Sequence, residues 1–429
     1  MKLNIKELLK DKFVRGTFFL TVANFGGAFL NYLVHPILTR RLSVAAYGDF
    51  QALLSFMAII SVLSAVINTT LIREVSGLTA KRPEEIGALR RRASRRFFWL
   101  GLVVFSLIVI FVKPLNELFK ISENNILIIA SLNFLYLFPS IVNRAVLSGR
   151  QEFLAMASLS FLDASARLGF IILFVAVWSF GLSGTAWALG SAGLITFLVS
   201  SYQIKKLHLP EAPIDFKPRL RKFWRYSLLV LWFMALTQFF YNFDMLFVKS
   251  SFSPEEAGLY GALLTVGRII YFVGAAVPLV MFPVIANLKE DKSLRSYIVL
   301  GKSVALLAAL AIPAYLIISL WPEFIIKIIV GSKYLSMAPY LPGFSLVMLA
   351  LTLVTILSNY FLALSSRRSL IILSVAAISE IISLNLFHHN LSEIILSLGL
   401  TFGGSSLGLS LLAWFKYNKT KRKLYAEKN

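Results

Sequence analysis

Residues 102–112 read Leu-Val-Val-Phe-Ser-Leu-Ile-Val-Ile-Phe-Val, an almost continuous apolar run with no charged side chain. A strand of a membrane barrel would alternate apolar and polar residues, so this run favours a helix that lies in lipid. About twelve stretches of this character are long enough to cross a bilayer. The predicted spans are 16–38, 47–72, 97–112, 125–143, 153–180, 183–204, 226–248, 256–285, 303–321, 338–364, 369–387 and 391–415.

The composition supports the same fold class, because 58% of the residues are hydrophobic and 15% are charged. We therefore predict an all-α, polytopic membrane protein of about twelve transmembrane helices, with no second soluble domain. The chain contains no cysteine, which excludes disulfides, cysteine nucleophiles and thiolate metal sites. It also lacks a glycine-rich nucleotide loop and other catalytic signatures, so we expect neither a cofactor nor an enzymatic activity.

Lysine and arginine residues divide unequally between the two sides of the predicted membrane. With the N-terminus in the cytoplasm, 34 of the 43 basic residues fall in the inner loops and the two ends. The positive-inside rule then predicts a multi-pass membrane protein with both termini cytoplasmic. The first span is too long for a signal-peptide core, so we interpret it as an uncleaved signal-anchor. The net charge of +22 reflects attraction to anionic membrane lipids, and nucleic acid is not an expected partner.

A basic, proline-containing loop, 205–225, divides the chain into an N-terminal lobe, 1–204, and a C-terminal lobe, 226–429, each with about six spans. A shift of 210 positions places 42–54 on 252–264, with Ser, Gly, Ala, Leu and Leu shared without a gap. Six spans separate the two blocks, so the repeat is parallel and predicts a pseudo-twofold axis along the membrane normal. A chance match is the alternative explanation.

The loop between the second and third spans contains a helix-initiation signal, since Pro83 is followed by Glu84 and Glu85. The helix that begins there carries five arginines. They serve either topology and attraction to the leaflet, or contact with anionic headgroups or a polyprenyl phosphate. The five are Arg90, Arg91, Arg92, Arg95 and Arg96.

Ionisable side chains inside the predicted spans are the sharpest indication of function, because each is costly in lipid unless it has a partner or water. Asp163 and Arg167 are four positions apart on one helical face and can pair. The pair is either structural, or it lets Arg167 meet an anionic substrate while Asp163 tunes it. Arg268 has no acidic residue three or four positions away. It therefore contacts either an anion, which its fork of donors suits, or a carboxylate on another span.

Polar side chains gather on spans one, two, seven and eight. Span one carries Asn24, Asn31 and His35 and is followed by Arg40 and Arg41, span two begins with Asp49 and Gln51, and span seven carries Gln238, Asn242 and Asp244. Glu380 in span eleven is a separate carboxylate. Burial disfavours the charged form of such groups, so Asp244, Glu380 or His35 could carry a coupling proton. The alternative for each is a structural, hydrogen-bonded role.

Three stretches resemble the polysaccharide and oligosaccharide flippases of the multidrug/oligosaccharidyl-lipid/polysaccharide exporter superfamily. Residues 38–50 read Leu-Thr-Arg-Arg-Leu-Ser-Val-Ala-Ala-Tyr-Gly-Asp-Phe, like the stretch after the first span of that family. Residues 257–262, with Arg268 and then 281–285, resemble its eighth span. Residues 148–153, followed by Arg167, resemble its fourth-to-fifth connection.

This resemblance implies two six-helix lobes that flank a cavity lined by spans one, two, seven and eight. It implies that the protein moves an undecaprenyl-pyrophosphate-linked oligosaccharide between the leaflets of a bacterial inner membrane by alternating access, for O-antigen or capsule synthesis, with a polymerase and a chain-length regulator as partners. The predicted substrate-binding residues are Arg268, Arg167, Arg40, Arg41, Asn31 and Gln51. The predicted ion-coupling residues are Asp244, Glu380, Asp163 and His35.

The repeat aligns Lys249, Ser250 and Ser251 with Thr39, Arg40 and Arg41, which argues against a symmetric phosphate clamp. Two other functions remain open at this point. One is a cation-coupled drug or metabolite antiporter of the same superfamily, and the other is a scaffold of a polysaccharide synthase that transports nothing.

Overall fold

The computed structural model describes residues 12–123, 125–210, 212, 217–288, 294–364 and 366–426, and in these ranges it is helical without a strand. Twelve of its helical segments are long and apolar enough to cross a membrane, as the hydropathy predicts. Contacts within the chain define two compact units, Met1–Met234 (unit 1) and Ala235–Asn429 (unit 2). The division falls inside a helix after the 205–225 loop, of which 211 and 213–216 lie outside the described residues.

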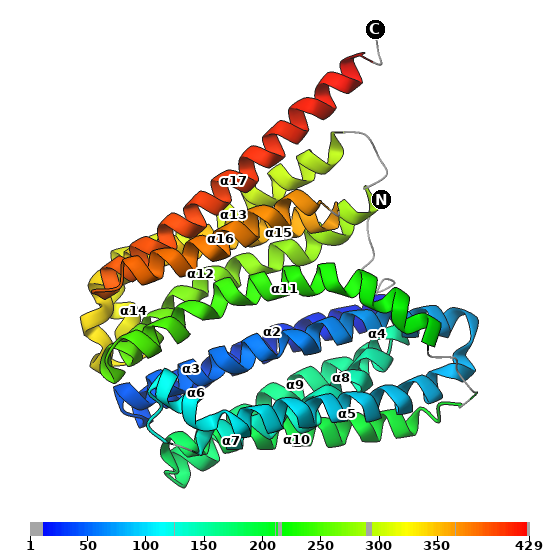
Figure 1. The fold of residues 1–429 in the computed structure, drawn as a ribbon, viewed down its shortest axis with the longest axis horizontal. Coiled ribbons are helices and arrows are strands. Elements are labelled where there is room, and N and C mark those ends of the chain that lie inside the picture. Colours follow the sequence, from blue (N-terminus) through cyan, green and yellow to red (C-terminus); the bar gives the residue numbers. More distant parts are fainter. Residues whose placement is uncertain are drawn as a thin grey trace. The chain divides into compact units, whose positions relative to one another are not determined.

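Unit 1 is a bundle of long helices that lie side by side (Figure 1). Its elements are α2 (Lys12–Arg41), α3 (Val44–Ile60), α4 (Val62–Lys81), a 3₁₀ turn (Pro83–Glu85), α5 (Ile86–Ile110), α6 (Val112–Phe119), α7 (Ile126–Ser131), α8 (Asn133–Gly149), α9 (Phe153–Ile171), a π-helical turn (Ile172–Val177) and α10 (Gly181–Lys206). The proline and its two acids therefore begin a helix as predicted.

Unit 2 contains the remaining spans, the first of which starts just before the division. Its elements are α11 (Lys217–Ser251), α12 (Pro254–Asn287), α13 (Arg295–Leu320), α14 (Pro322–Ile329), a 3₁₀ stretch (Ser332–Tyr340), α15 (Leu341–Ala363), α16 (Arg367–Leu386) and α17 (Leu391–Ala426).

The 210-residue offset of the sequence repeat recurs in the helix ends of the two units. Matching positions are the ends of α2 and α11 (Arg41, Ser251), the starts of α3 and α12 (Val44, Pro254), the ends of α5 and α13 (Ile110, Leu320), the whole of α6 and α14, and the starts of α10 and α17 (Gly181, Leu391). The offset drifts at the opposite ends, where α8 and α15 end at Gly149 and Ala363. The internal similarity therefore extends well beyond the 13-residue block.

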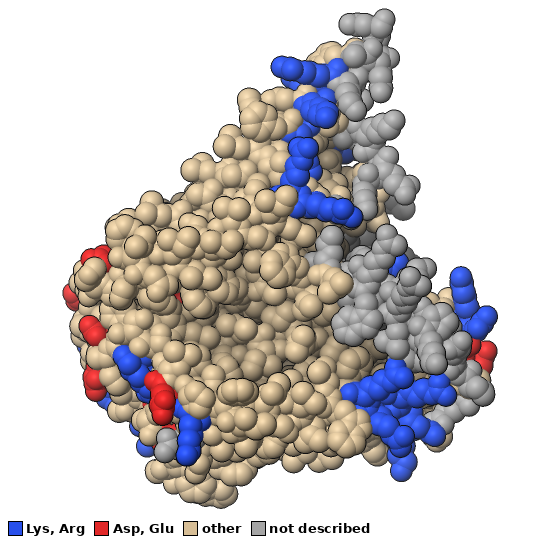
Figure 2. Space-filling view, in the orientation of Figure 1, with Lys and Arg blue, Asp and Glu red and all other residues tan. Residues whose placement is uncertain are grey.

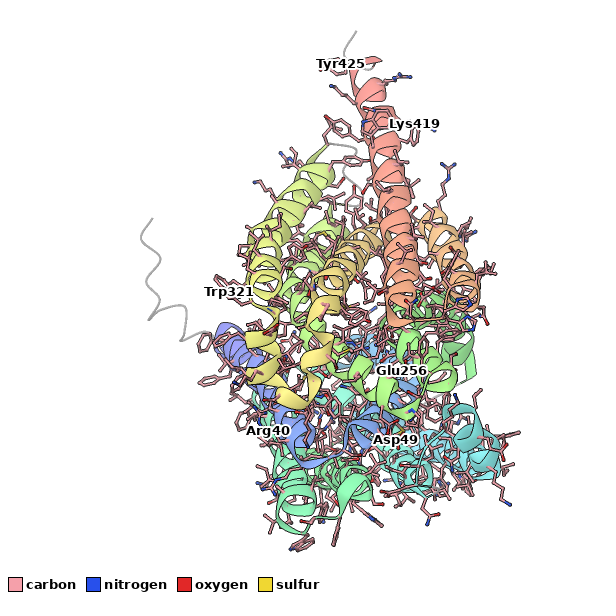
Figure 3. The ribbon with its side chains drawn as sticks, turned by 90° about the vertical axis from the view of Figure 1, so that its left-hand side faces the viewer. Arg40, Asp49, Glu256, Trp321, Lys419 and Tyr425 are labelled. Carbon is pink, nitrogen blue, oxygen red and sulfur yellow. The ribbon has the colours of Figure 1, made fainter. Side chains whose placement is uncertain are left out.

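The turn between the first two spans of each unit is fixed by its own serine. The Ser43 hydroxyl accepts a hydrogen bond from the Ala46 amide at 3.1 Å, and the Ser253 hydroxyl accepts one from the Glu256 amide at 3.3 Å. Glu256 completes a capping box by accepting from the Ser253 amide at 3.1 Å. In Figure 3, Arg40 and Asp49 mark this turn in unit 1, and Glu256 marks the corresponding turn in unit 2.

The second predicted span, 47–72, is not one straight helix, because it breaks at Ser61 between α3 and α4. The Ser61 hydroxyl donates to the Ala58 carbonyl at 2.8 Å, and the Ser64 hydroxyl donates to the Ser61 carbonyl at 2.5 Å. Serine hydroxyls that bond to backbone carbonyls bend helices. At the repeat position in unit 2 stands Tyr271, and α12 runs through it unbroken.

Helix packing relies on glycine at several close approaches. A Cβ on Gly101 of α5 would lie 2.4 Å from the Phe134 carbonyl oxygen, and one on Gly267 of α12 would lie 2.4 Å from the ring of Phe344. Small residues let helices in lipid approach closely. Figure 2 shows that, on the face in view, charged side chains lie near the helix ends, with basic side chains along the last turns of α17 in unit 2, and are few along the middle.

Candidate transport site

The polar site of unit 2 begins with Asp244 on α11, whose side chain is 2% exposed. Its Oδ1 accepts a hydrogen bond from the Met245 amide at 2.7 Å, and its Oδ2 accepts one from the Tyr260 hydroxyl at 2.8 Å. Tyr260 lies on α12 and is fully buried. The two hydrogen bonds fix the carboxylate between the first two helices of the unit.

Glu380 on α16 belongs to the same site. It is fully buried, and neither of its carboxylate oxygens has a hydrogen-bond partner among the residues that the structure describes. The charge of Asp244 acts on Glu380, and the charge of Glu380 acts on Tyr260, the tyrosine that donates to Asp244. Glu380, which the sequence places on a separate span, thus lies within electrostatic range of Asp244.

Arg268 on α12 is held by Tyr241 of α11. Its Nη2 donates to the Tyr241 carbonyl, and its guanidinium carbon lies 4.0 Å from the centre of the Tyr241 ring. No carboxylate of the described residues lies within 4.0 Å of it, although its charge attracts Asp244 from farther away. The guanidinium is thus positioned by a carbonyl and a ring, and its charge is not neutralised by a direct ion pair.

The charges of this site do not balance when every group is ionised. Arg268 supplies one positive charge, while Asp244 and Glu380 supply two negative ones. A buried carboxylate without donors is strongly disfavoured as an anion. The arrangement can therefore bind a proton or a small cation at Glu380 and release it when the surroundings change.

A hydrogen-bonded chain in unit 1 joins His35, Tyr47 and Gln51. His35 Nδ1 lies 2.9 Å from the Tyr47 hydroxyl, and Gln51 Nε2 donates to the same hydroxyl at 2.8 Å. Tyr47 is fully buried. Asn31, also on α2, has a buried Oδ1 without a hydrogen-bond partner among the described residues.

Each unit thus ties its first two spans together through a tyrosine hydroxyl and a titratable side chain. The pairs are His35 with Tyr47 and Asp244 with Tyr260. The two tyrosines do not align in the repeat, since Tyr47 corresponds to Ala257, about one helical turn before Tyr260. The sequence predicts a role for His35 and Asp244 because they are titratable side chains within spans. It does not predict that Tyr47 and Tyr260 are their hydrogen-bond partners.

The basic residues after the first span lie outside this group. Arg40 and Arg41 are exposed at the end of α2, and Nη1 of Arg40 donates to the Pro36 carbonyl at 2.8 Å. Asp49 accepts hydrogen bonds from the Ser122 amide at 3.2 Å and hydroxyl at 2.5 Å, which ties α3 to the segment after α6. Asp49 therefore has a structural contact of its own.

A second charged cluster in unit 1 contains the pair that the sequence predicts. Arg167 Nη2 lies 3.2 Å from Asp163 Oδ2, and the Thr196 hydroxyl donates to Asp163 Oδ1 at 3.1 Å. Arg144 interacts electrostatically with both members of the pair. The sequence pattern assigned Arg144 to the loop after span four, but α8 continues to Gly149 and places it inside the helix.

The profile of the family described as "Polysaccharide biosynthesis protein" matches residues 13–289. No curated protein matches the sequence significantly. Among solved structures, an inward-facing multidrug resistance MATE family transporter of the MOP superfamily superposes with a TM-score of 0.76 at 11% identity, over 92% of this chain and 95% of that one. The lipid II flippase MurJ in an inward closed conformation gives a TM-score of 0.73 at 14% identity, over 94% and 90%.

A third structure is a MOP superfamily transporter from Pyrococcus furiosus, with a TM-score of 0.64 at 14% identity, over 97% of this chain and 98% of that one. At these identities the likeness concerns the fold. The fold class predicted from the hydropathy is thereby confirmed. The protein is a multi-pass membrane protein with the fold of MOP superfamily transporters, and it belongs to the polysaccharide biosynthesis protein family.

Proposed function

We propose that this protein is a flippase that moves a polyprenyl-pyrophosphate-linked oligosaccharide across a bacterial inner membrane by alternating access, for the synthesis of a surface polysaccharide such as O-antigen or capsule. The observation that carries the proposal is the state of Arg268. Its guanidinium lies within a membrane span, is held by the carbonyl and ring of Tyr241, and lacks a direct carboxylate partner among the described residues. Such a fixed, unneutralised fork suits a phosphate or pyrophosphate group.

The family and the fold give this proposal its context. The family profile concerns polysaccharide biosynthesis, and one structure of the same fold is a lipid II flippase. A pyrophosphate on a lipid carrier is an anion that has to cross an apolar core, and a buried cation lowers the cost of that passage. Cytoplasmic termini, a polysaccharide polymerase and a chain-length regulator as partners belong to the same proposal.

The carboxylates of unit 2 supply the coupling in this mechanism. Glu380 takes up a proton when the site faces one side of the membrane and loses it when the site faces the other. Because the charge of Asp244 both acts on Glu380 and attracts Arg268, protonation of Glu380 removes one negative charge from the site that holds the guanidinium. A proton that binds one conformation better than the other gives the cycle a direction.

Reconstitution tests the proposal directly. Purified protein in liposomes is given a fluorescent undecaprenyl-pyrophosphate oligosaccharide, and outer-leaflet sugar is removed by an added glycosidase over time. We expect the protected fraction to disappear in liposomes that hold the protein and to persist in protein-free liposomes. Persistence in both would refute the proposal.

An antiporter of the same superfamily is the second candidate, and the buried carboxylate pair favours it specifically. Proton-driven exchange of a small cation needs such groups but does not need a fixed arginine. Uptake of a fluorescent cationic dye into inside-out vesicles under a proton gradient separates the two. Dye transport together with failure to move the lipid-linked sugar would favour the antiporter.

A further inference from the structure

The charged cluster between α8, α9 and α10 carries more positive than negative charge. Arg144 and Arg167 are both basic, whereas Asp163 is the one carboxylate of the described residues whose charge acts on Arg144. The pair of Asp163 and Arg167 remains partly open, with side chains 28% and 32% exposed. The cluster therefore carries a net positive charge, and its ion pair is not enclosed by protein.

The guanidinium groups also have more donors than acceptors. Arg144 makes one long hydrogen bond, 3.5 Å from Nη2 to the Leu159 carbonyl, and Arg167 Nε is buried without a partner among the described residues. Each guanidinium has five N–H donors, and leaving them unsatisfied in a span is costly. Arg90 shows the contrast, because its Nε is bonded to Asn143 Oδ1 at 3.1 Å and the Asn143 amide continues to Ser200 at 3.0 Å.

The two arginines lie at different depths along their helices. Arg144 stands five residues before the end of α8 and Arg167 fourteen residues after the start of α9, at the helix ends that the charge pattern assigns to the inner face. At 1.5 Å per residue these positions are about 8 Å and about 21 Å from the respective ends. An anion that passes from Arg144 to Arg167 would move from near the inner surface toward the middle of the membrane.

We infer that Arg144 and Arg167 provide two successive oxyanion contacts in unit 1, which take the pyrophosphate of the lipid-linked substrate in turn on its way in from the inner leaflet. This inference rests on the proposed function and adds a second anion site to the one at Arg268. Asp163 is a built-in competitor for the same donors. It keeps Arg167 in place when the site is empty and keeps the affinity low enough for release.

Replacing Asp163 changes the affinity for an anion in opposite directions under the two interpretations of the cluster. If the cluster is a structural ion pair, Asp163→Asn removes a stabilising partner and binds no anion more tightly. If the cluster is an oxyanion site, the same change raises its net charge and frees Arg167, so the affinity for an anion rises. Asparagine retains an oxygen for the Thr196 hydroxyl, which preserves one of the two contacts of the side chain.

The probe is farnesyl pyrophosphate, titrated calorimetrically into the full chain in phosphatidylcholine nanodiscs. We expect Arg144→Gln and Arg167→Gln each to weaken binding about tenfold or more, and Asp163→Asn to tighten it about tenfold, the scale of one charged hydrogen bond. Arg150→Gln, just past the end of α8, is the matched control and should leave the affinity within about twofold of the native value, because Arg150 lies outside the cluster. Arg144→Lys keeps the charge and should retain part of the binding.

Several results would overturn the inference. One is unchanged affinity in both glutamine variants while each elutes as a folded monodisperse species. A second is weaker binding in Asp163→Asn at native thermal stability. A third is loss of farnesyl pyrophosphate binding when the nanodiscs contain phosphatidylglycerol in place of phosphatidylcholine, which would assign the site to membrane headgroups. A protein that fails to bind farnesyl pyrophosphate but still flips the lipid-linked sugar would refute this inference alone. A protein that binds farnesyl pyrophosphate but does not flip the sugar would refute the proposed function.

Discussion

The hydroxyl of Tyr260 donates a 2.8 Å hydrogen bond to Oδ2 of Asp244, so the first two helices of unit 2 are joined inside the membrane by a carboxylate. Both side chains are buried, and the Asp244 carboxylate has a second bond from the Met245 amide. A buried carboxylate with donors on both oxygens is held in one rotamer. The position of the Asp244 carboxylate is therefore fixed, and so is the position of its charge relative to the helices that carry Glu380 and Arg268.

Removing the Tyr260 hydroxyl should leave the Asp244 carboxylate less firmly held. We expect Tyr260→Phe to lower the stability of the protein by about 1–3 kcal/mol, because Asp244 Oδ2 loses its donor. Thermal unfolding of the purified protein in detergent measures the change. Tyr425→Phe, on an exposed ring, is the control and should not move the transition. Equal melting temperatures for the two variants would show that the hydrogen bond contributes nothing.

The carboxylate pair should govern coupling. Asp244→Asn and Glu380→Gln imitate the protonated forms, so each should reduce transport of the lipid-linked sugar more than its binding. Glu380→Gln should in addition remove the response of transport to an imposed pH gradient, because Glu380 is the group without donors. Native rates and native pH response in both variants would transfer the coupling role to His35 or to another site.

Arg268 should be required for transport but not for folding. We expect Arg268→Ala to abolish flipping in the reconstituted assay at normal protein abundance, since the guanidinium contacts one carbonyl and one ring. Arg268→Lys should restore part of the activity, because a point charge cannot reproduce the bidentate fork. Arg295→Ala, on an exposed side chain at the start of α13, serves as the control. Full complementation of a flippase-null strain by Arg268→Ala would leave this arginine a structural role.

The orientation of the chain can be measured because it has no cysteine of its own. Single cysteines at Ser332 and His388, both exposed, should react with a membrane-impermeant maleimide added to whole cells after the outer membrane is made permeable. Single cysteines at Ala80 and Arg367, which are also exposed, should react only when the cells have been lysed. The opposite pattern would reverse the direction of transport that the charge distribution predicts.

Close helix packing predicts a glycine effect of opposite sign at two positions. Gly101→Ala should destabilise the protein by about 1–3 kcal/mol, because its Cβ would meet a backbone carbonyl that cannot move alone. Gly77→Ala on α4, with open space around the added Cβ, should stabilise it by up to about 1 kcal/mol through helix propensity. Thermal unfolding of the two variants gives the sign of each change in stability. A destabilising Gly77→Ala would contradict the open space around Gly77.

Much of the fold could be predicted from the sequence, because helices in lipid must satisfy their own backbone hydrogen bonds and therefore appear as apolar runs of known length. The ion pair of Asp163 and Arg167 was predictable for a related reason, since residues four apart share a helical face. The break at Ser61 was not. Serines occur in many straight helices, and whether their hydroxyls bend one depends on its neighbours.

The composition of the polar sites could be predicted only in part. Charged residues in spans are visible in any hydropathy profile, which identified Asp244, Glu380 and Arg268. Their grouping depends on the packing of different helices, so the sequence pattern leaves Glu380 as a separate carboxylate and leaves the partner of Arg268 open between an anion and a carboxylate of another span. The sequence places Tyr241 near Asp244 but does not predict the contacts of Tyr241 and Tyr260, because tyrosine is common in membrane helices and its hydroxyl or ring matters only where it lies beside a charge.

The constant register of the helix ends has a practical meaning for the turns between helices. In both units the turn after the first span is two residues long, from Arg41 to Val44 and from Ser251 to Pro254, and the short helices α6 and α14 have kept one length. On the opposite side the connection between α4 and α5, residues 82–85, is shorter than the one between α12 and α13, residues 288–294, whereas three residues join α8 to α9 and α15 to α16. The two units thus accommodate different lengths at the connection between α12 and α13, so an epitope tag or a fused reporter belongs in 288–294 and not in a turn that has one length in both units.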